Sequence, residues 1–203
     1  RKVRMAAEQR RELSRKVDER TRDLKKANVE LETVNAKLVE ASVTDSLTGL
    51  KNRRYLDTVI EDRISAIDRR CNEHGAPPSP QIAFDISPRM FFMMIDLDGF
   101  KDINDDHGHH AGDQALIQVS EILKSCCRPT DLLIRWGGDE FLIVGDCGAD
   151  RAVEKLAENI RVRLAETQFA LGGGHVGRMS GSIGYALYPY APLSPELMSW
   201  EKV

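Results

Sequence analysis

Hydrophobic residues recur with a period of seven over residues 1–42, a stretch that contains neither Gly nor Pro. The two seam positions of each repeat hold Val3, Ala6, Arg10, Leu13, Val17, Arg20, Leu24, Ala27, Leu31, Val34, Leu38 and Ala41. Ten of these twelve residues are apolar, which is typical of a coiled coil. A helix that packs on its own domain needs a wider apolar face. We therefore expect a dimerisation and signalling helix over residues 1–42, weaker near Arg10 and Arg20.

From residue 43 onward, the hydrophobic pattern predicts helices that alternate with strands. The order of these elements predicts one α/β domain over residues 43–203, with a central mixed sheet flanked by helices. Helices are expected over residues 56–70, 113–127 and 150–167, strands over 90–95 and 179–188, a β-hairpin over 132–144 around Gly137-Gly138, and a Pro-rich loop over 71–88.

The composition agrees with a folded domain, since 41% of the residues are hydrophobic and 30% are charged. The net charge of −3 gives no reason to expect binding to nucleic acid. Four cysteines occur without any C-x-x-C pair, so we expect free thiols rather than a zinc site or a disulfide framework. No apolar run is long enough to span a membrane, and no signal peptide is visible. These features predict a cytoplasmic domain, and the first residue, Arg1, predicts a part of a longer protein.

Acidic residues follow the most apolar of the predicted strands, at Asp96 and Asp98. A calcium loop is excluded, because Lys101 and His107 stand where such a loop needs Gly and Glu. A simple structural turn would account for these acidic residues if they stood alone.

The predicted hairpin carries a second acidic pair, Asp139-Glu140, directly after Gly137-Gly138. The glycines leave room for a phosphate to approach the backbone. Together with Asp96, the two carboxylates can hold two Mg²⁺ ions, an arrangement suited to phosphoryl transfer. The combination is more specific for such chemistry than either segment alone.

Residues 135–141, Arg-Trp-Gly-Gly-Asp-Glu-Phe, resemble the signature motif of the GGDEF family of diguanylate cyclases. Three further segments match the family pattern in order, at residues 45–54, 96–101 and 104–113. The resemblance covers roughly residues 43–190. It implies a palm- or cyclase-like sheet and an enzyme that condenses two GTP into cyclic di-GMP and two pyrophosphates. Each half-site of a homodimer, formed through residues 1–42, would hold one GTP.

The resemblance also implies roles for individual residues. Asp96, the carbonyl of Leu97, Asp139 and Glu140 would hold two Mg²⁺ or Mn²⁺ ions per half-site. Asp139 and Glu140 would be the catalytic residues, one of which helps to deprotonate the ribose 3′-hydroxyl. The substrate-binding residues would be Phe100, Lys101, Asn104, His109, Asp113, Gly137 and Gly138.

Guanine recognition would fall to Asn104 and Asp113, because a carboxylate accepts from the N1–H and amino group that adenine does not offer together. Phe100 and Lys101 would cradle phosphates through backbone N–H groups and the Lys charge. His109 would lie against the substrate. Taken alone, residues 104–106 suggest a turn and His109 suggests an ordinary surface residue.

Arg128 and Asp131 form an R-x-x-D pair ahead of the hairpin, where the family has its product-inhibition site. We expect cyclic di-GMP to bind there as an inhibitor, with a further arginine from Arg161 or Arg163. The family pattern continues after the last strand into a basic helix that touches the triphosphate, whereas this chain ends at Val203. The resemblance therefore implies an incomplete C-terminal end and impaired catalysis.

Other functions stay open at this point. A non-catalytic cyclic di-GMP receptor would use Arg128 and Asp131 alone, but such a domain is expected to have lost acidic residues of the hairpin. A cyclase with an adenine-containing product should lack the carboxylate of Asp113, and an inert domain on a coiled-coil scaffold leaves the acidic residues unexplained. Basic residues at 1–16 indicate an upstream sensor or membrane segment.

Overall fold

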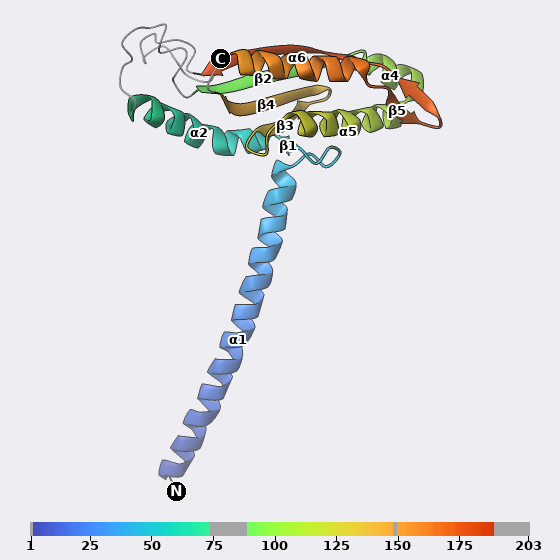
Figure 1. Cartoon of the computed structure of the whole chain (residues 1–203). Coiled ribbons are helices and arrows are strands. Elements are labelled where there is room, and N and C mark those ends of the chain that lie inside the picture. Colours follow the sequence, from blue (N-terminus) through green and yellow to red (C-terminus); the bar gives the residue numbers. More distant parts are fainter. Residues whose placement is uncertain (1, 74–88, 148–149, 189–203) are drawn as a thin grey trace. The chain divides into compact units, whose positions relative to one another are not determined.

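The computed structural model describes residues 2–73, 89–147 and 150–188. The chain divides into two compact units, Arg1–Ser42 and Val43–Val203. The first unit consists of one long helix, α1 (Lys2–Val43), where the heptad pattern predicts a helix. The second unit contains the sheet and the remaining helices (Figure 1).

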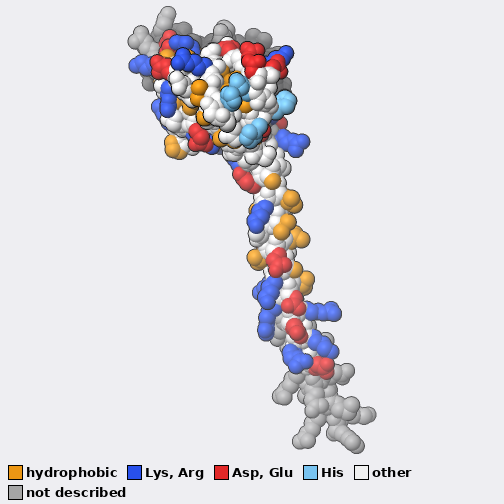
Figure 2. Space-filling view, turned by 90° about the vertical axis from the view of Figure 1, so that its right-hand side faces the viewer, with side chains coloured by type: hydrophobic (Ala, Val, Ile, Leu, Met, Phe, Trp, Pro, Cys, Tyr) orange, Lys and Arg blue, Asp and Glu red, His pale blue; other side chains and the backbone are white. Residues whose placement is uncertain are grey.

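Apolar side chains lie exposed along the C-terminal half of α1 (Figure 2). Leu24, Leu31 and Leu38 expose 70%, 67% and 64% of their surface, and Val34 exposes 56%. All four occupy seam positions of the predicted coiled coil. Such a stripe is expected of a helix that pairs with another helix.

A five-stranded mixed sheet forms the centre of the second unit, in the order β1-β3-β4-β2-β7. β1 runs parallel to β3, and all other neighbours are antiparallel. The predicted central mixed sheet and its hairpin are therefore confirmed. The strands are β1 (Lys51–Asn52), β2 (Arg89–Asp98), β3 (Leu132–Gly137), β4 (Glu140–Cys147) and β7 (Ser180–Tyr188).

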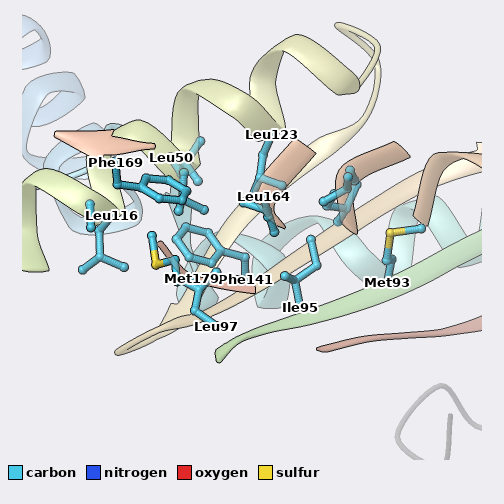
Figure 3. Packing of buried hydrophobic residues seen from close by; sticks show 14 of the residues in the cluster. Leu50, Met93, Ile95, Leu97, Leu116, Leu123, Phe141, Leu164, Phe169 and Met179 are labelled. Carbon is cyan, nitrogen blue, oxygen red and sulfur yellow. The ribbon is translucent and has the colours of Figure 1, made fainter. Parts of the chain in front are cut away.

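Helices cover both faces of this sheet (Figure 1). α2 (Arg53–Glu73) packs on one face through Leu56 and Ile60. α5 (His109–Cys126) and α6 (Asp150–Glu166) pack on the other face and form the larger core (Figure 3). The three predicted helices of the domain thus sit where the apolar periodicity placed them, with bounds that differ by a few residues.

The alternation of side chains along β2 decides where its acidic residues point. Met93, Ile95 and Leu97 lie in the core beneath α5 and α6 (Figure 3). Asp96 therefore belongs to the opposite face, the one that α2 covers at the other end of the strand. That face is already open at Met94, which exposes 36% of its surface. β2, which has a neighbouring strand on each side, thus exposes the Asp96 carboxylate to solvent near its C-terminal end.

Four short elements were not predicted: β1, α4 (Phe100–His107), β5 (Phe169–Gly172) and β6 (His175–Gly177). β5 and β6 form a separate two-stranded sheet. α4 buries Ile103 as its single fully buried residue, so its helical periodicity is too short to detect. Residues 104–106, which alone suggest a turn, are therefore part of a helix.

The first three residues of the predicted loop 71–88 belong to α2, and 74–88 lie outside the described residues, as do 189–203. Cys126 and Cys127 are free thiols, as predicted. In the part of the chain that the structure describes, no helix combines the length and apolar character needed to cross a membrane.

Candidate active site

Two carboxylates face each other across neighbouring strands of the sheet. Asp96 of β2 pairs with Glu140 of β4 in the antiparallel register. Residues paired in this way point to the same face, with Cβ atoms roughly 4.5–5.5 Å apart. Both residues are exposed, and no group among the described residues donates a hydrogen bond to either carboxylate. Two like charges at this spacing repel each other unless a cation lies between them.

The second acidic residue of β2 is placed differently. Asp98 accepts hydrogen bonds from the hydroxyls of Ser180 at 3.1 Å and Ser182 at 3.0 Å, both on β7. This carboxylate joins the end of β2 to the edge strand, which leaves Asp96 as the carboxylate of β2 that is free to bind a ligand.

The turn between β3 and β4 consists of Gly138 and Asp139. Gly138 has a φ of 48°, in the left-handed region that favours glycine. A Cβ atom at Gly137 would come no closer than 4.0 Å to the Glu140 carboxylate, and one at Gly138 would meet nothing within that distance. The structure therefore places Asp139 and Glu140 beside a backbone that a ligand can approach.

Arg135 holds this turn in place. Its Nη2 and Nε donate to the carbonyl oxygen of Gly138 at 2.8 and 3.1 Å. Its Nη1 donates to both carboxylate oxygens of Asp45 at 3.2 Å. Thr48 donates to the same carboxylate from its amide at 2.9 Å and from its hydroxyl at 2.7 Å. Burial works to raise the pKa of Asp45, but the hydrogen bonds from Thr48 and Arg135 outweigh it and hold that pKa below its usual value.

A cavity of about 510 Å³ opens beside the turn, lined among others by Arg53, Arg54, Arg135, Trp136 and Gly138. The guanidinium of Arg53 lies 4.5 Å from the centre of the Trp136 ring, as in a cation–π contact. A cavity of this size accommodates small ligands such as nucleotides. Neither Arg135 nor the Asp45 that it binds was predicted as a site residue. The sequence did contain one indication of their role, because both residues belong to segments that match the GGDEF family pattern.

The N-terminus of α4 offers backbone donors near the end of β2. α4 begins at Phe100, after Gly99 with a φ of 84°. The first amides of a helix, here those of Phe100 and Lys101, have no carbonyl partner within the helix, and Gly99 has no side chain to cap them. These amides and the positive end of the helix dipole are suited to a phosphate group.

Gly108, with a φ of 82°, forms the corner between α4 and α5. Asn104 lies in the last turn of α4, while His109 and Asp113 lie in the first turns of α5. Asn104 is half-buried, whereas His109 and Asp113 are exposed. The corner therefore brings three of the predicted substrate-binding residues to one place on the surface.

The predicted product site lies at the start of β3, whereas the turn lies at its end. A strand of six residues separates them by about 20 Å. The Arg128 amide donates to the Asp131 carboxylate at 2.8 Å, and the Asp131 amide donates to the Arg128 carbonyl at 3.0 Å. Arg128 itself is exposed. The two residues form a closed turn that presents the Arg128 side chain to solvent.

The two candidate arginines for this product site differ in their contacts. Arg161 donates to the Glu158 carboxylate at 2.7 and 2.8 Å on the exposed face of α6. Arg163 donates to the Ser125 hydroxyl at 2.7 Å, at the end of α5 that leads to Arg128. Of the two, Arg163 is the one that contacts the end of α5 just before the R-x-x-D turn.

No point within the described residues gathers three or more His, Cys, Asp or Glu side chains around a possible metal ion. Mg²⁺ does not need such a cluster, because it is usually bound by one or two carboxylates, substrate phosphates and waters. The facing carboxylates of Asp96 and Glu140 are oxygen donors that fit this requirement. Asp139 and the Leu97 carbonyl are their neighbours in sequence.

Comparison with known proteins decides the family of this chain. The model of the family described as "Diguanylate cyclase, GGDEF domain" matches residues 79–198, more than half of the chain. The chain belongs to the GGDEF family. The match contains the facing carboxylates, the hairpin turn and the corner at Gly108 described above.

Among relatives of this GGDEF domain is MucR of Pseudomonas aeruginosa, a bifunctional diguanylate cyclase/cyclic di-GMP phosphodiesterase. It is 35% identical over 159 residues, which are 78% of this chain and 21% of MucR. Diguanylate cyclase A of Treponema denticola is 33% identical over 156 residues, 77% of this chain and 38% of that protein. The chain thus spans only about a fifth to two fifths of the length of these two relatives.

The coiled coil and GGDEF domain of DgcB from Caulobacter crescentus, solved in complex with c-di-GMP, has the same fold. It aligns with a TM-score of 0.61 at 25% identity and covers 86% of this chain and 82% of that structure. A long helix followed by a GGDEF domain is therefore an arrangement that occurs in another solved protein.

Proposed function

We propose that this chain is a diguanylate cyclase domain that condenses two GTP into cyclic di-GMP and two pyrophosphates. The observation that carries the proposal is the pairing of Asp96 with Glu140 beside the open Gly137-Gly138 backbone. Two facing carboxylates next to a phosphate-accessible turn are suited to metal-assisted phosphoryl transfer. The family membership and the names of the relatives support the same reaction.

Asp96, the Leu97 carbonyl, Asp139 and Glu140 would hold Mg²⁺ or Mn²⁺, two ions per half-site. Such ions, when bound, neutralise phosphate charge and lower the pKa of the attacking hydroxyl. Asp139 or Glu140 accepts the proton of the ribose 3′-hydroxyl. The 3′-oxygen then forms a bond to the α-phosphorus of the second GTP, while the bond from that phosphorus to pyrophosphate breaks. The 3′-oxygen of the second nucleotide then attacks the α-phosphorus of the first in the same way. This step releases the second pyrophosphate and closes the ring.

The remaining substrate contacts follow from the elements around the carboxylates. Asn104 and Asp113 read the edge of guanine at the corner between α4 and α5, with His109 beside them. The amides of Phe100 and Lys101 bind phosphate at the N-terminus of α4, and the Lys101 side chain adds a positive charge. Gly137 and Gly138 leave the space in which the triphosphate lies.

Each domain holds one GTP, so two domains must face each other to react. We propose that residues 1–42 supply this homodimer as a coiled coil, through the exposed seam of α1. The domain assignment is then a dimerisation helix over residues 1–42 and a cyclase domain over 43–203. The basic residues near the N-terminus suit an upstream sensor or membrane segment, with the domain itself in the cytoplasm, where GTP is available.

Cyclic di-GMP would bind as an inhibitor at Arg128 and Asp131, with Arg163 as the further arginine. The exposed guanidinium of Arg128 can clamp a phosphate or stack on a guanine. Product bound there would restrain the domain at the start of β3, the end of the strand that is far from the hairpin turn.

The test is turnover of GTP with Mg²⁺, followed by chromatography of the nucleotide products. The chain should form cyclic di-GMP, and Glu140→Gln should reduce the rate by at least about 10²-fold, as expected for loss of a catalytic group. Asp146→Asn is the matched control, because Asp146 lies at the other end of β4 and pairs with Arg70 on the surface. It should leave the rate unchanged.

A different result would favour the receptor. In that result, the dimeric chain binds cyclic di-GMP, the binding depends on Arg128, and neither the wild-type chain nor Glu140→Gln turns over GTP. The non-catalytic receptor function would then replace this proposal.

A further inference from the structure

Gly112 lies in the first turns of α5, where its conformation gives no reason for a glycine. It is buried and has no positive φ. A side chain would therefore be compatible with the backbone, and alanine would stabilise the helix relative to glycine. Some neighbour must require the absence of a Cβ atom at this position.

That neighbour is Asn104. A Cβ atom added to Gly112 would overlap Asn104 Oδ1 and lie only 2.9 Å from Cγ and 3.2 Å from Nδ2. The whole amide group of Asn104 thus occupies the space next to the Gly112 backbone. Rotation about the last bond of the Asn104 side chain cannot relieve the contact, because Cγ itself is too close. Only a different position of the entire amide group would do so.

The position of Gly112 in the corner explains why the two residues meet. Asn104 lies in the last turn of α4 and Gly112 in the first turns of α5, with Gly108 between them. Backbone bonds hold this corner: the Gly108 amide donates to the Asn104 carbonyl at 2.9 Å, and the Gly112 amide donates to the Gly108 carbonyl at 3.4 Å. Asp113, the other proposed guanine reader, directly follows Gly112.

We propose that Gly112 is a positioning residue for guanine specificity, because it leaves the space in which the Asn104 amide is held at the correct angle toward the base. The proposal rests on the proposed function, in which Asn104 reads the guanine edge. Gly112 itself touches neither the base nor the phosphates and acts only through Asn104. It therefore determines which purine the site accepts rather than how fast phosphoryl transfer occurs.

The test compares the full chain with Gly112→Ala, Asn104→Ala and the double variant. Dissociation constants for GTP and for ITP, which lacks the 2-amino group of guanine, are measured by calorimetry. Gly112→Ala should weaken GTP binding by about tenfold and reduce the preference for GTP over ITP, which corresponds to a loss near 1.4 kcal/mol. The double variant should bind GTP no more weakly than Asn104→Ala alone, since both changes act on one amide. Glu121→Ala, on the exposed side of α5, should leave the preference unchanged.

Thermal unfolding separates this effect from a folding defect. In the Asn104→Ala background, Gly112→Ala should raise the melting temperature, because the helix gains and nothing is displaced. The proposal is overturned if Gly112→Ala keeps the wild-type preference for GTP over ITP. It is also overturned if the losses of GTP affinity in Gly112→Ala and Asn104→Ala add in full in the double variant. If the wild-type chain itself shows no preference for GTP, the proposed function fails first and this inference fails with it.

Discussion

Arg135 and Asp45 form a partly buried ion pair, with 16% and 22% of their side-chain surfaces exposed. The same guanidinium also binds the carbonyl of Gly138 in the hairpin turn. Asp45 follows the last residue of α1 by two positions, and Gly138 precedes Asp139. The Arg135 side chain therefore connects the first residues of the domain with the hairpin turn that carries the proposed catalytic carboxylates. Because water is partly excluded, this pair is screened less than a pair on the surface.

Replacing Arg135 by Ala should loosen the hairpin turn. The Gly138 carbonyl and the Asp45 carboxylate would each lose a charged donor, so we expect the free energy of unfolding to fall by about 1–3 kcal/mol. Cyclic di-GMP formation should fall by at least about tenfold, since Asp139 and Glu140 would be less well placed. Urea unfolding and the turnover assay measure the two effects.

The matched control is Arg161→Ala, because Arg161 also pairs with a carboxylate through two bonds but lies on the exposed surface of α6. It should change neither stability nor turnover. An Arg135→Ala enzyme that is less stable but fully active would show that the turn does not depend on this arginine for catalysis.

Acid should remove the contribution of Asp45 to stability. Its pKa is lower in the folded chain than in the unfolded one, where it is about 3.9. The stabilisation is therefore complete above about pH 4 and is lost as the pH falls through the lower folded value. Asp45→Asn should remove this component. The difference in urea stability between wild type and Asp45→Asn should be constant from pH 7 to 5 and should shrink toward pH 3. A difference that stays constant down to pH 3 would contradict the assigned protonation.

The hydrophobic pattern was sufficient for the elements that carry many buried residues. β2 was recognisable because Met90 to Ile95 is a continuous apolar run, and α5 because its buried residues recur at helical spacing. α4 was not, since only Ile103 is fully buried among its eight residues. Short elements of this kind are fixed by packing against neighbours rather than by their own sequence.

The site shows the same limit. Asp96 and Glu140 could be placed near each other from the sequence, because one ends a strand and the other follows a turn. Their direct pairing depends on the register between β2 and β4, which the sequence does not display. The roles of Arg135 and Gly112 depend on contacts with Asp45 and Asn104 that only the folded chain brings together.

Mg²⁺ should stabilise the chain through Glu140 even without nucleotide. Like charges directly opposite each other on neighbouring strands destabilise the sheet, so Glu140→Gln should raise the melting temperature in a metal-free buffer. In wild type, millimolar Mg²⁺ should also raise the melting temperature, whereas Glu140→Gln should respond much less. Asp146→Asn, at the opposite end of β4, should keep the wild-type response to Mg²⁺. An equal response of both variants would mean that the ion binds elsewhere.

Cys127 should resist alkylation in the folded chain. Burial, followed by the nearby charge of Asp131 and the neighbouring Cys126, raises the pKa of Cys127 to about 12. Very little thiolate is then present at pH 8, and the thiolate is the reactive form. Iodoacetamide followed by mass spectrometry should find Cys127 unmodified in native protein and modified after unfolding in urea. Asp131→Asn should increase the native rate, because one of the three causes is removed. Rapid native modification of Cys127 would contradict the buried environment.

A charge in the exposed seam of α1 should separate the proposed dimer and thereby stop the proposed reaction. Leu31 exposes 67% of its surface at a seam position, where a lysine would be buried against the partner helix at a cost of a few kcal/mol. Leu31→Lys should therefore weaken dimerisation by at least about tenfold in sedimentation velocity. Turnover should fall with the dimer fraction and recover as the protein concentration rises, because each half-site of the proposed enzyme needs a second one. Glu32→Lys adds the same side chain one position outside the seam and should leave both measurements unchanged. A monomeric Leu31→Lys chain with wild-type turnover would show that catalysis does not require two domains to meet.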